Sequence, residues 1–168
     1  MKNIGLSIIL IMAFTQCEKS DCRLPEWTNN ISELYDYNSE KVSISQGIAG
    51  TLTQAEGNCM PVIDLNGDCM EFPVSREIHL YEYTTLDDVV QDSPGFYSEV
   101  NTNKIGQITA DEEGFFELQL EEGVYSVFVK EDGKLYANSF NGQGGIQTIE
   151  ILSIKVSTLN LKIDYAVY

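Results

Sequence analysis

One stretch constrains the fold more than any other: Asp111–Lys130 alternates apolar and polar residues on both sides of a short turn. Apolar side chains recur at every second position in each half, and Gly114 and Gly123 stand just before the two runs. Alternation at period two is typical of half-buried β-strands, and a glycine-containing turn between two such runs indicates a β-hairpin. We therefore predict two strands that pair as a hairpin through the turn at Glu121-Glu122-Gly123.

Short apolar runs elsewhere in the chain predict further strands, because glycine-containing turns separate them and none has the length of a long helix. The predicted strands are 47–52, 77–84, 105–110, 134–140, 145–151 and 156–165, and 86–97 is predicted as a polar loop or short helix. Seven or eight short strands without a long helix predict an all-β fold, a Greek-key β-sandwich.

The composition is that of a globular chain that can bury a core, with 43% hydrophobic and 10% aromatic residues. Ten Lys and Arg residues stand against 26 Asp and Glu residues, a net charge of -16. Such a surface repels phosphate backbones, so we expect no nucleic-acid partner. The acidity serves either solubility or an acidic face for a cationic partner.

The N-terminus predicts a targeting segment over residues 1–16. Lys2 precedes an apolar run at 4–14, which is too short to span a bilayer because a spanning helix needs about 20 residues. The segment resembles a bacterial lipoprotein signal of the Bacteroidota type, in which Cys17 becomes the first mature residue and carries the lipid. With Glu18 and Asp21 after the cysteine, that resemblance implies an outer-membrane lipoprotein displayed at the cell surface and held to the membrane by lipid. The alternative is an ordinary secretory signal with an incidental cysteine.

After the signal, residues 17–46 are polar and poorly periodic and are predicted to be a tether, while 47–168 form the domain. A short helix is possible after Asn30, which is a good helix cap, through the run 31–36. Trp27 is the single tryptophan, and we expect it to dock on the domain because burying so large a ring contributes roughly 1.5–3 kcal/mol.

Three cysteines remain after Cys17. Cys59 and Cys69 bracket one loop, and an envelope compartment permits disulfides, so we predict a bridge between them. Closing so short a loop contributes roughly 2–3 kcal/mol by the chain-entropy estimate. Cys22 is then unpaired, unless it takes one of the other two.

The same loop has the D-x-N-x-D spacing of calcium loops at Asp64, Asn66 and Asp68. That spacing places three oxygen-bearing side chains on one side of a tight turn, as a hard cation requires. The rest of the EF-hand pattern is missing, because Cys69 and Ser75 stand where a glycine and the bidentate glutamate belong. Asx-Gly turn chemistry explains the three residues equally well. Calcium is the one candidate cofactor.

Four segments of the domain resemble the carboxypeptidase regulatory-like family in their order: 47–52, 73–74, 108–116 and 120–127. The resemblance covers about 47–165 and implies a prealbumin-like (transthyretin-like) sandwich of seven strands, related to Ig-like folds and common as an accessory module. The motifs are turn and core residues, and no catalytic residue is carried across. The segments at 59–69 and 86–103 depart from the family pattern, so we expect the specific activity in those loops.

Catalysis is not expected, because His79 is the only histidine. The hydrolases and dioxygenases with prealbumin-like folds and the zinc site of a carboxypeptidase all need more than one. Neither a nucleophile motif nor a phosphate-binding loop is present in the sequence. His79 lies between apolar neighbours in a predicted strand, and we expect it to be a half-buried packing residue.

The tyrosines are the candidate binding residues. Of nine, Tyr81, Tyr83, Tyr97, Tyr136 and Tyr168 are predicted to form an aromatic face for a glycan or protein ligand. The alternative is ordinary β-propensity, which also favours tyrosine in strands. The prediction is a non-catalytic module for binding, adhesion or scaffolding. Alternatives are a glycan-binding accessory domain and a carrier of the transthyretin kind, which would require an oligomer.

Overall fold

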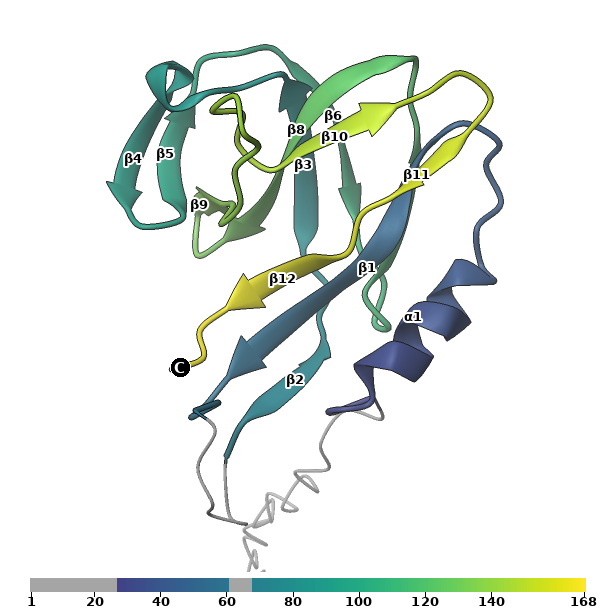
Figure 1. Cartoon of the computed structure of the whole chain (residues 1–168), viewed down its shortest axis with the longest axis vertical. Coiled ribbons are helices and arrows are strands. Elements are labelled where there is room, and N and C mark those ends of the chain that lie inside the picture. The colour runs from purple at the N-terminus through teal and green to yellow at the C-terminus, as the bar shows by residue number, and fades with distance from the viewer. Residues whose placement is uncertain (1–26, 61–67) are drawn as a thin grey trace, which may run out of the picture.

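The computed structural model describes residues 27–60 and 68–168, which form one α-helix, a short 3-10 helix and twelve strands in two sheets (Figure 1). The helices are α1 (Ile31–Ser39) and η1 (Leu86–Asp88). The strands are β1 (Gly47–Glu56), β2 (Met70–Pro73), β3 (Glu77–Glu82), β4 (Val89–Ser93), β5 (Phe96–Val100), β6 (Lys104–Thr109), β7 (Phe115–Gln119), β8 (Gly123–Glu131), β9 (Lys134–Tyr136), β10 (Thr148–Ile151), β11 (Val156–Thr158) and β12 (Leu161–Asp164).

The five-stranded sheet is built around β1, which is longer than each of its neighbours. On one side β1 pairs in parallel with β11 along its first half and with β12 along its second half. On the other side it pairs antiparallel with β7 and then with β2. One ten-residue strand therefore holds four shorter ones in register.

The seven-stranded sheet is antiparallel, in the order β4-β5-β9-β8-β3-β6, and β10 pairs with the first half of β8. Neither sheet closes on itself, and the two pack face to face, as in a β-sandwich. Their inward side chains form one core in which Leu52, Ile78, Val127 and Ile163 are fully buried. Fully burying a side chain of this size contributes about 1.5–3 kcal/mol.

The predicted hairpin is half right. Both strands exist, as β7 and β8, but they do not pair with each other: β7 pairs with β1 and β8 with β3. The turn before Gly123 therefore carries the chain from one sheet to the other, and Leu120 at this crossing is buried in the core. Alternation determines which face of a strand is buried. It does not determine which strand is its hydrogen-bonded neighbour, because the buried face packs against the opposite sheet in either case.

The segment 86–97, predicted as a polar loop or short helix, contains η1, strand β4 and the start of β5. A three-residue 3-10 helix is present at its start, but most of the segment forms strands. The strands were missed because β4 is almost wholly exposed and so has no apolar alternation. Tyr97 of β5 is fully buried and anchors this β4–β5 hairpin on the sheet. The single strand predicted at 156–165 is two strands, β11 and β12, and β2 was not predicted.

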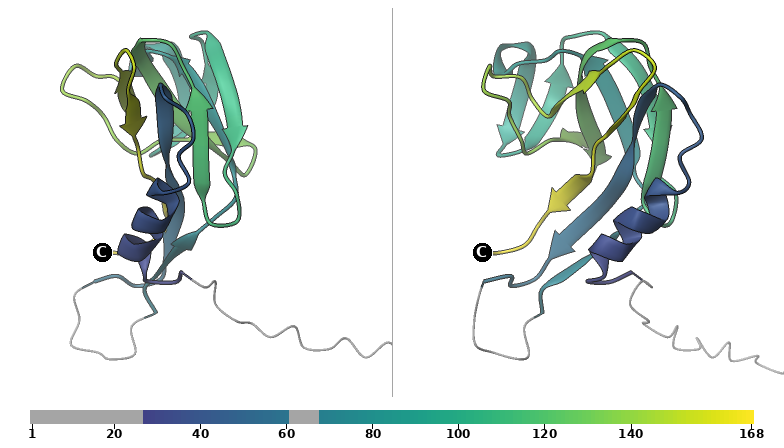
Figure 2. Two further views of the ribbon diagram at one scale, coloured as in Figure 1. Left: turned by 90° about the vertical axis from the view of Figure 1, so that its right-hand side faces the viewer. Right: turned by 45° about the vertical axis from the view of Figure 1, so that its right-hand side comes forward.

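Residues 27–46, here called the strap, differ from the predicted tether. The short helix predicted after Asn30 is present as α1, and it lies over the outer face of the five-stranded sheet (Figure 2). Leu34 is fully buried beneath it. The sheet can accept a helix here because the outward residues of β1 are small, among them Ala49 and Thr51, both nearly inaccessible to solvent.

Gly114 allows the closest backbone approach at the start of β7. Its φ is +72°, and a Cβ atom built there would lie 2.2 Å from the Leu52 carbonyl oxygen. The Leu52 N–H donates to the Gly114 carbonyl oxygen at 2.8 Å, so the turn is bonded directly to β1. Only glycine adopts this backbone conformation at no steric cost and leaves room for the contact.

We expect Gly114→Ala to lower the free energy of unfolding by about 2–5 kcal/mol, because it adds backbone strain and a clash with β1. Gly133→Ala is the matched control, since Gly133 has a similar φ of +79° but no atom within 4 Å of the added Cβ. Urea denaturation measures both. Equal losses for the two variants would contradict the role given to the Leu52 contact.

Candidate functional site

The predicted aromatic face of five tyrosines is wrong for three of them. Tyr81, Tyr97 and Tyr136 are at most 9% exposed. Tyr83 is half-buried, with its hydroxyl 3.4 Å from Asn141 Oδ1 and 3.3 Å from the Gln143 carbonyl oxygen. These tyrosines therefore cannot form an exposed row.

A second, smaller core accounts for Tyr81 and Tyr97. Both rings meet Phe128 edge-on, with centroids 5.6 Å apart in each pair. The cluster is completed by Ala137 and Ile146, from the segment that follows β9. Residues 86–103 thus supply structure, because β4 and β5 extend the seven-stranded sheet beyond β9 and Tyr97 of β5 packs into this second core.

A different set of rings surrounds an open groove of about 450 Å³ between β5, β9 and the segment that follows β12. We call it the aromatic groove. Its lining residues are Gln91, Pro94, Gly95, Phe96, Tyr136, Ala137, Asn138, Phe140, Asp164, Ala166 and Tyr168. Phe140 and Tyr168 are 51% and 65% exposed. A concave site with rings and a few polar groups is the usual form of a ligand site, and its volume is within the usual range of about 300–1,000 Å³.

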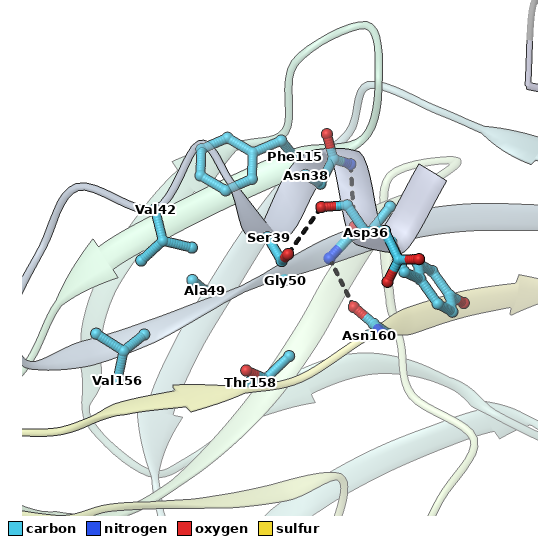
Figure 3. Close-up of a pocket in the computed structure, with 12 residues that line it drawn as sticks. Asp36, Asn38, Ser39, Val42, Ala49, Gly50, Phe115, Val156, Thr158 and Asn160 are labelled. Atoms are coloured by element: carbon cyan, nitrogen blue, oxygen red, sulfur yellow. Dashed lines mark hydrogen bonds between the residues drawn. The ribbon is translucent and has the colours of Figure 1, made fainter. Parts of the chain in front are cut away.

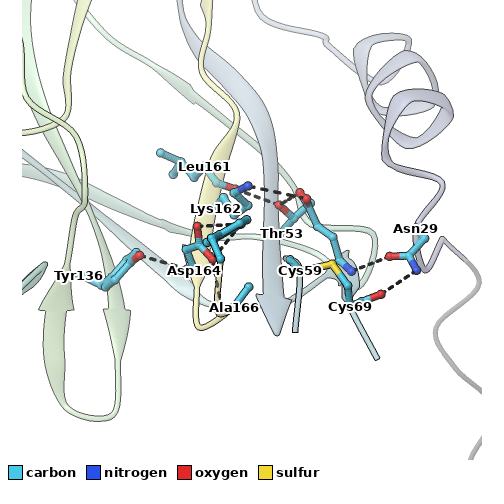
Figure 4. A network of polar contacts seen from close by, with 11 residues as sticks. Asn29, Thr53, Cys59, Cys69, Tyr136, Leu161, Lys162, Asp164 and Ala166 are labelled. Carbon is cyan, nitrogen blue, oxygen red and sulfur yellow. Dashed lines mark hydrogen bonds and ion pairs between the residues drawn. A yellow bond between two sulfur atoms is a disulfide. The ribbon is translucent and has the colours of Figure 1, made fainter. Parts of the chain in front are cut away.

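The floor of the groove is rigid because its rings pack on one another. Phe96 lies against Tyr136 with centroids 5.0 Å apart and against Tyr165 at 6.5 Å. Tyr136 also bridges the two sheets, since its hydroxyl oxygen accepts the Asp164 N–H at 3.0 Å (Figure 4). Burial raises the pKa of Tyr136, so the hydroxyl stays neutral.

Tyr165 is held behind the groove by a buried carboxylate. Its hydroxyl donates to Glu131 Oε1 at 3.2 Å, and Arg76 Nε donates to Glu131 Oε2 at 2.7 Å. Burial and then the Glu131 charge raise the pKa of Tyr165 to about 12. Tyr165 is therefore a neutral donor at physiological pH, and it ties the end of β12 to β8.

Asp164 sets the position of the outermost ring. The Tyr168 hydroxyl lies 3.3 and 3.2 Å from the two Asp164 carboxylate oxygens, and the Ala166 N–H donates to one of them at 3.2 Å. Asp164 carries the only charged side chain among the described residues that line the groove. The groove thus offers rings, two amides and one carboxylate.

Sequence reasoning missed Phe96, Phe140 and Tyr165, and it found Tyr168. A signal existed for Phe140, which stands immediately before Asn141-Gly142, a turn where no strand would bury a large ring. No comparable signal existed for Phe96, because its role depends on β5 lying beside β9.

A second cleft, also of about 450 Å³, lies between α1, β1 and β11 (Figure 3). Val42, Ala49 and Val156 form its apolar part, while Asp36 and Asn160 lie at its polar side. The unpartnered Oδ1 atom of Asn38 is not exposed to solvent, so it is not offered to a ligand in the cleft.

Several polar groups that line this cleft are bonded within the protein: the Ser39 hydroxyl donates to the Asp36 carbonyl at 2.7 Å, and Asn160 Oδ1 accepts the Thr51 N–H at 3.0 Å. We take the aromatic groove as the candidate site because exposed rings line it.

The strap that bounds this cleft is fastened along its length. Asn38 is 2% exposed, and its Nδ2 donates to Thr51 Oγ1 at 3.0 Å and to the Glu113 carbonyl at 2.8 Å. The Ser43 hydroxyl and N–H bond Glu117 and hold the pKa of that carboxyl below its ordinary value. The stabilisation of the folded state by these bonds to Glu117 is fully present above the ordinary glutamate pKa. It is lost as the pH falls through the lowered pKa of Glu117. Trp27 stacks on Tyr37 of α1 with centroids 5.2 Å apart, so this contact holds the ring on the strap's own helix, whereas the prediction placed it on the domain.

The predicted disulfide is confirmed: Cys59 and Cys69 are bonded, with Cα atoms 4.8 Å apart. The bridge lies beside the end of the strap, where Asn29 Nδ2 donates to the Cys69 carbonyl at 3.1 Å (Figure 4).

Several predicted features lie outside the described residues. They are the lipidation residue Cys17, the unpaired Cys22, and two of the three calcium candidates, Asp64 and Asn66. Asp68 is described, and its Oδ1 accepts the N–H of Asn58, ten residues earlier in the chain, at 2.8 Å. Within 27–60 and 68–168, no group of three or more His, Cys, Asp or Glu residues is placed to hold a metal ion. No helix in the same ranges is long and apolar enough to cross a membrane.

His79 is largely buried on β3, and its Nε2 contacts the Glu77 carboxylate. Its Nδ1 is buried without a hydrogen-bond partner among the described residues. The prediction of a half-buried packing residue is confirmed. His79 is not among the residues that line the aromatic groove.

Comparisons of the chain with protein-family models, with curated proteins and with solved structures found no match. Any function must therefore be argued from the chain's own residues.

We expect Asn38→Ala to lower the free energy of unfolding by about 1–3 kcal/mol, because it leaves the Glu113 carbonyl without its donor. Hydrogen exchange of α1 amides should accelerate in step with the loss. Ser32→Ala, at an exposed position of the same helix, is the control and should change little. Unchanged exchange in Asn38→Ala would show that the strap is held by other contacts.

Proposed function

We propose that the protein is a non-catalytic binding protein of the cell envelope, attached to the outer membrane by a lipid on Cys17 and displayed at the cell surface. Its β-sandwich presents the aromatic groove to a ligand. The observation that carries the binding function is the gathering of exposed rings, Phe140 and Tyr168, around an open groove with a packed aromatic floor.

The strand order supports a Greek-key sandwich of the prealbumin-like, carboxypeptidase regulatory-like kind. β8 returns beside β3 after β7 has crossed to the other sheet, so neighbours in the sheet are not neighbours in sequence. Connections that pass from one sheet of a sandwich to the other and back are typical of Greek-key sandwiches. Modules of this kind bind or position partners, and an open groove at the edge of the sandwich is suited to that role.

The arrangement of polar groups supports binding over catalysis. General acid–base or nucleophilic chemistry needs a base within hydrogen-bond reach of the reacting group. The one histidine lies on Glu77, away from the groove, and Asp164 already accepts bonds from Tyr168 and Ala166. The groups of the groove are suited to holding a molecule by ring contact and hydrogen bonds.

Cys17→Ala should abolish incorporation of labelled palmitate and release the protein from the membrane fraction, because the lipid is the proposed attachment. Cys22→Ala is the matched control and should remain labelled. Protease added to intact cells should degrade the parent protein, as surface display requires. A Cys17→Ala variant that still carries palmitate would contradict the anchoring.

We also expect substitutions in the groove to reduce ligand capture by intact cells. The double variant Phe140→Ser/Tyr168→Ser should lose capture of envelope or medium components by at least about tenfold, the equivalent of 1.4 kcal/mol. Leu86→Ser/Ile154→Ser removes apolar side chains that are 51% and 85% exposed and do not line the groove, so it should bind like the parent. Chemical crosslinking followed by mass spectrometry measures capture. Equal loss in both double variants would show non-specific adhesion.

A further inference from the structure

We infer that the aromatic groove binds a neutral carbohydrate chain, with sugar rings stacked on Phe140 and Tyr168 and hydroxyls bonded by Asp164 and the neighbouring amides. This inference rests on the binding function proposed above and names the ligand class for the same site.

The exposed rings of the groove favour a sugar as the ligand. Phe140 and Tyr168 stand 51% and 65% exposed, while Phe96 and Tyr136 form a floor that cannot rearrange without breaking the ring packing. A pyranose presents a flat face of C–H groups with hydroxyls at its edge. An exposed aromatic ring buries such a face from water while the hydroxyls stay at the edge, where polar groups can reach them.

Pockets suited to aliphatic side chains are missing among the described residues that line the groove. Among the described lining residues, the aliphatic ones are Pro94, Ala137 and Ala166, which are small or form the rim. A peptide that binds by leucine, isoleucine or valine anchors needs deep apolar pockets for them. The groove offers ring surface instead.

The second edge of β12, which lies beside the groove, is obstructed for main-chain pairing. Among the described residues β12 pairs only with β1, so its other edge could in principle accept a peptide as an added strand. The Asp164 N–H on that edge already donates to the Tyr136 hydroxyl oxygen at 3.0 Å. Main-chain pairing is therefore obstructed where it would meet the groove, and recognition must come from side chains.

The charge of the groove favours a neutral ligand. Asp164 carries the only charged side chain among the described lining residues, and the chain has a net charge of -16. A carboxylate has about four acceptor positions, and the hydrogen bonds to the Asp164 carboxylate among the described residues come from the Tyr168 hydroxyl and the Ala166 N–H, so acceptor capacity remains for sugar hydroxyls. The Lys162 ammonium lies close enough to Asp164 to interact with its charge and does not line the groove. Gln91 and Asn138 add amide donors and acceptors. Uronic acids and sulfated sugars would be repelled.

The experiment screens the full-length lipoprotein, in micelles of a detergent without a sugar headgroup, against an array of neutral, anionic and cationic oligosaccharides of five or more residues. A proline-rich peptide is included, because such peptides also bind grooves lined by aromatic residues. Calorimetry then measures the strongest binder against the parent and the variants Phe140→Ala, Tyr168→Ala, Tyr168→Phe and Ile154→Ser.

We expect a neutral oligosaccharide to bind, at least tenfold more weakly to Phe140→Ala and Tyr168→Ala. Tyr168→Phe keeps the ring but loses the bond to Asp164, so its affinity should fall between those of the parent and Tyr168→Ala. Ile154→Ser, whose side chain does not line the groove, should stay within about threefold of the parent. Circular dichroism of each variant confirms that the exposed substitutions leave the fold intact.

Other results overturn the inference in distinguishable ways. No neutral binder, or anionic sugars bound as tightly as neutral ones, rejects the ligand class. If the proline-rich peptide binds with the same dependence on Phe140 and Tyr168, the groove remains a binding site and only the carbohydrate assignment fails. If no ligand depends on either ring and the cell-based capture is also unchanged, the proposed binding function fails with it.

Discussion

The pairing of β1 with four other strands is the interaction on which the rest of the structure depends. β11 and β12 come from the end of the chain, β2 and β7 from its middle, and each meets only one half of β1. β1 is extended along the centre of its sheet, so its two faces contact different parts of the molecule. One face packs into the core through Ile48 and Leu52, and the other receives the strap.

Both candidate cavities are consequences of that arrangement. The small outward side chains Ala49 and Thr51 let α1 approach, but they leave the cleft between the helix and β11 incompletely filled. On the far side, β12 ends near β9 at an edge of the sandwich, where the Tyr136 hydroxyl accepts the Asp164 N–H and the Tyr165 hydroxyl donates to Glu131. The buried Tyr136 ring that bridges the two sheets there also lines the aromatic groove, so the same packing that stabilises the fold positions the proposed site.

Much of the fold was predictable because burial leaves a local signature. The period-two runs marked β1, β3, β6, β7 and β8 within a few residues, and the spacing of Cys59 and Cys69 indicated their bridge. β4 left no such signature, since it is exposed and held by hydrogen bonds to β5. For the site, the abundance of tyrosine correctly indicated clustered rings but misidentified the members, because alternation cannot distinguish the main core, the second core and the surface.

The sequence by itself determined that the chain forms short, amphipathic strands with turns at its glycines, because side-chain periodicity and backbone freedom act within a few residues. Only the tertiary structure decided that β7 and β8 belong to different sheets, that residues 27–46 cover the five-stranded sheet, and that Phe96, Phe140 and Tyr168 share one groove. Those outcomes depend on which distant segments meet. Several partners would bury the same apolar face, and the choice among them comes from the packing of the whole domain.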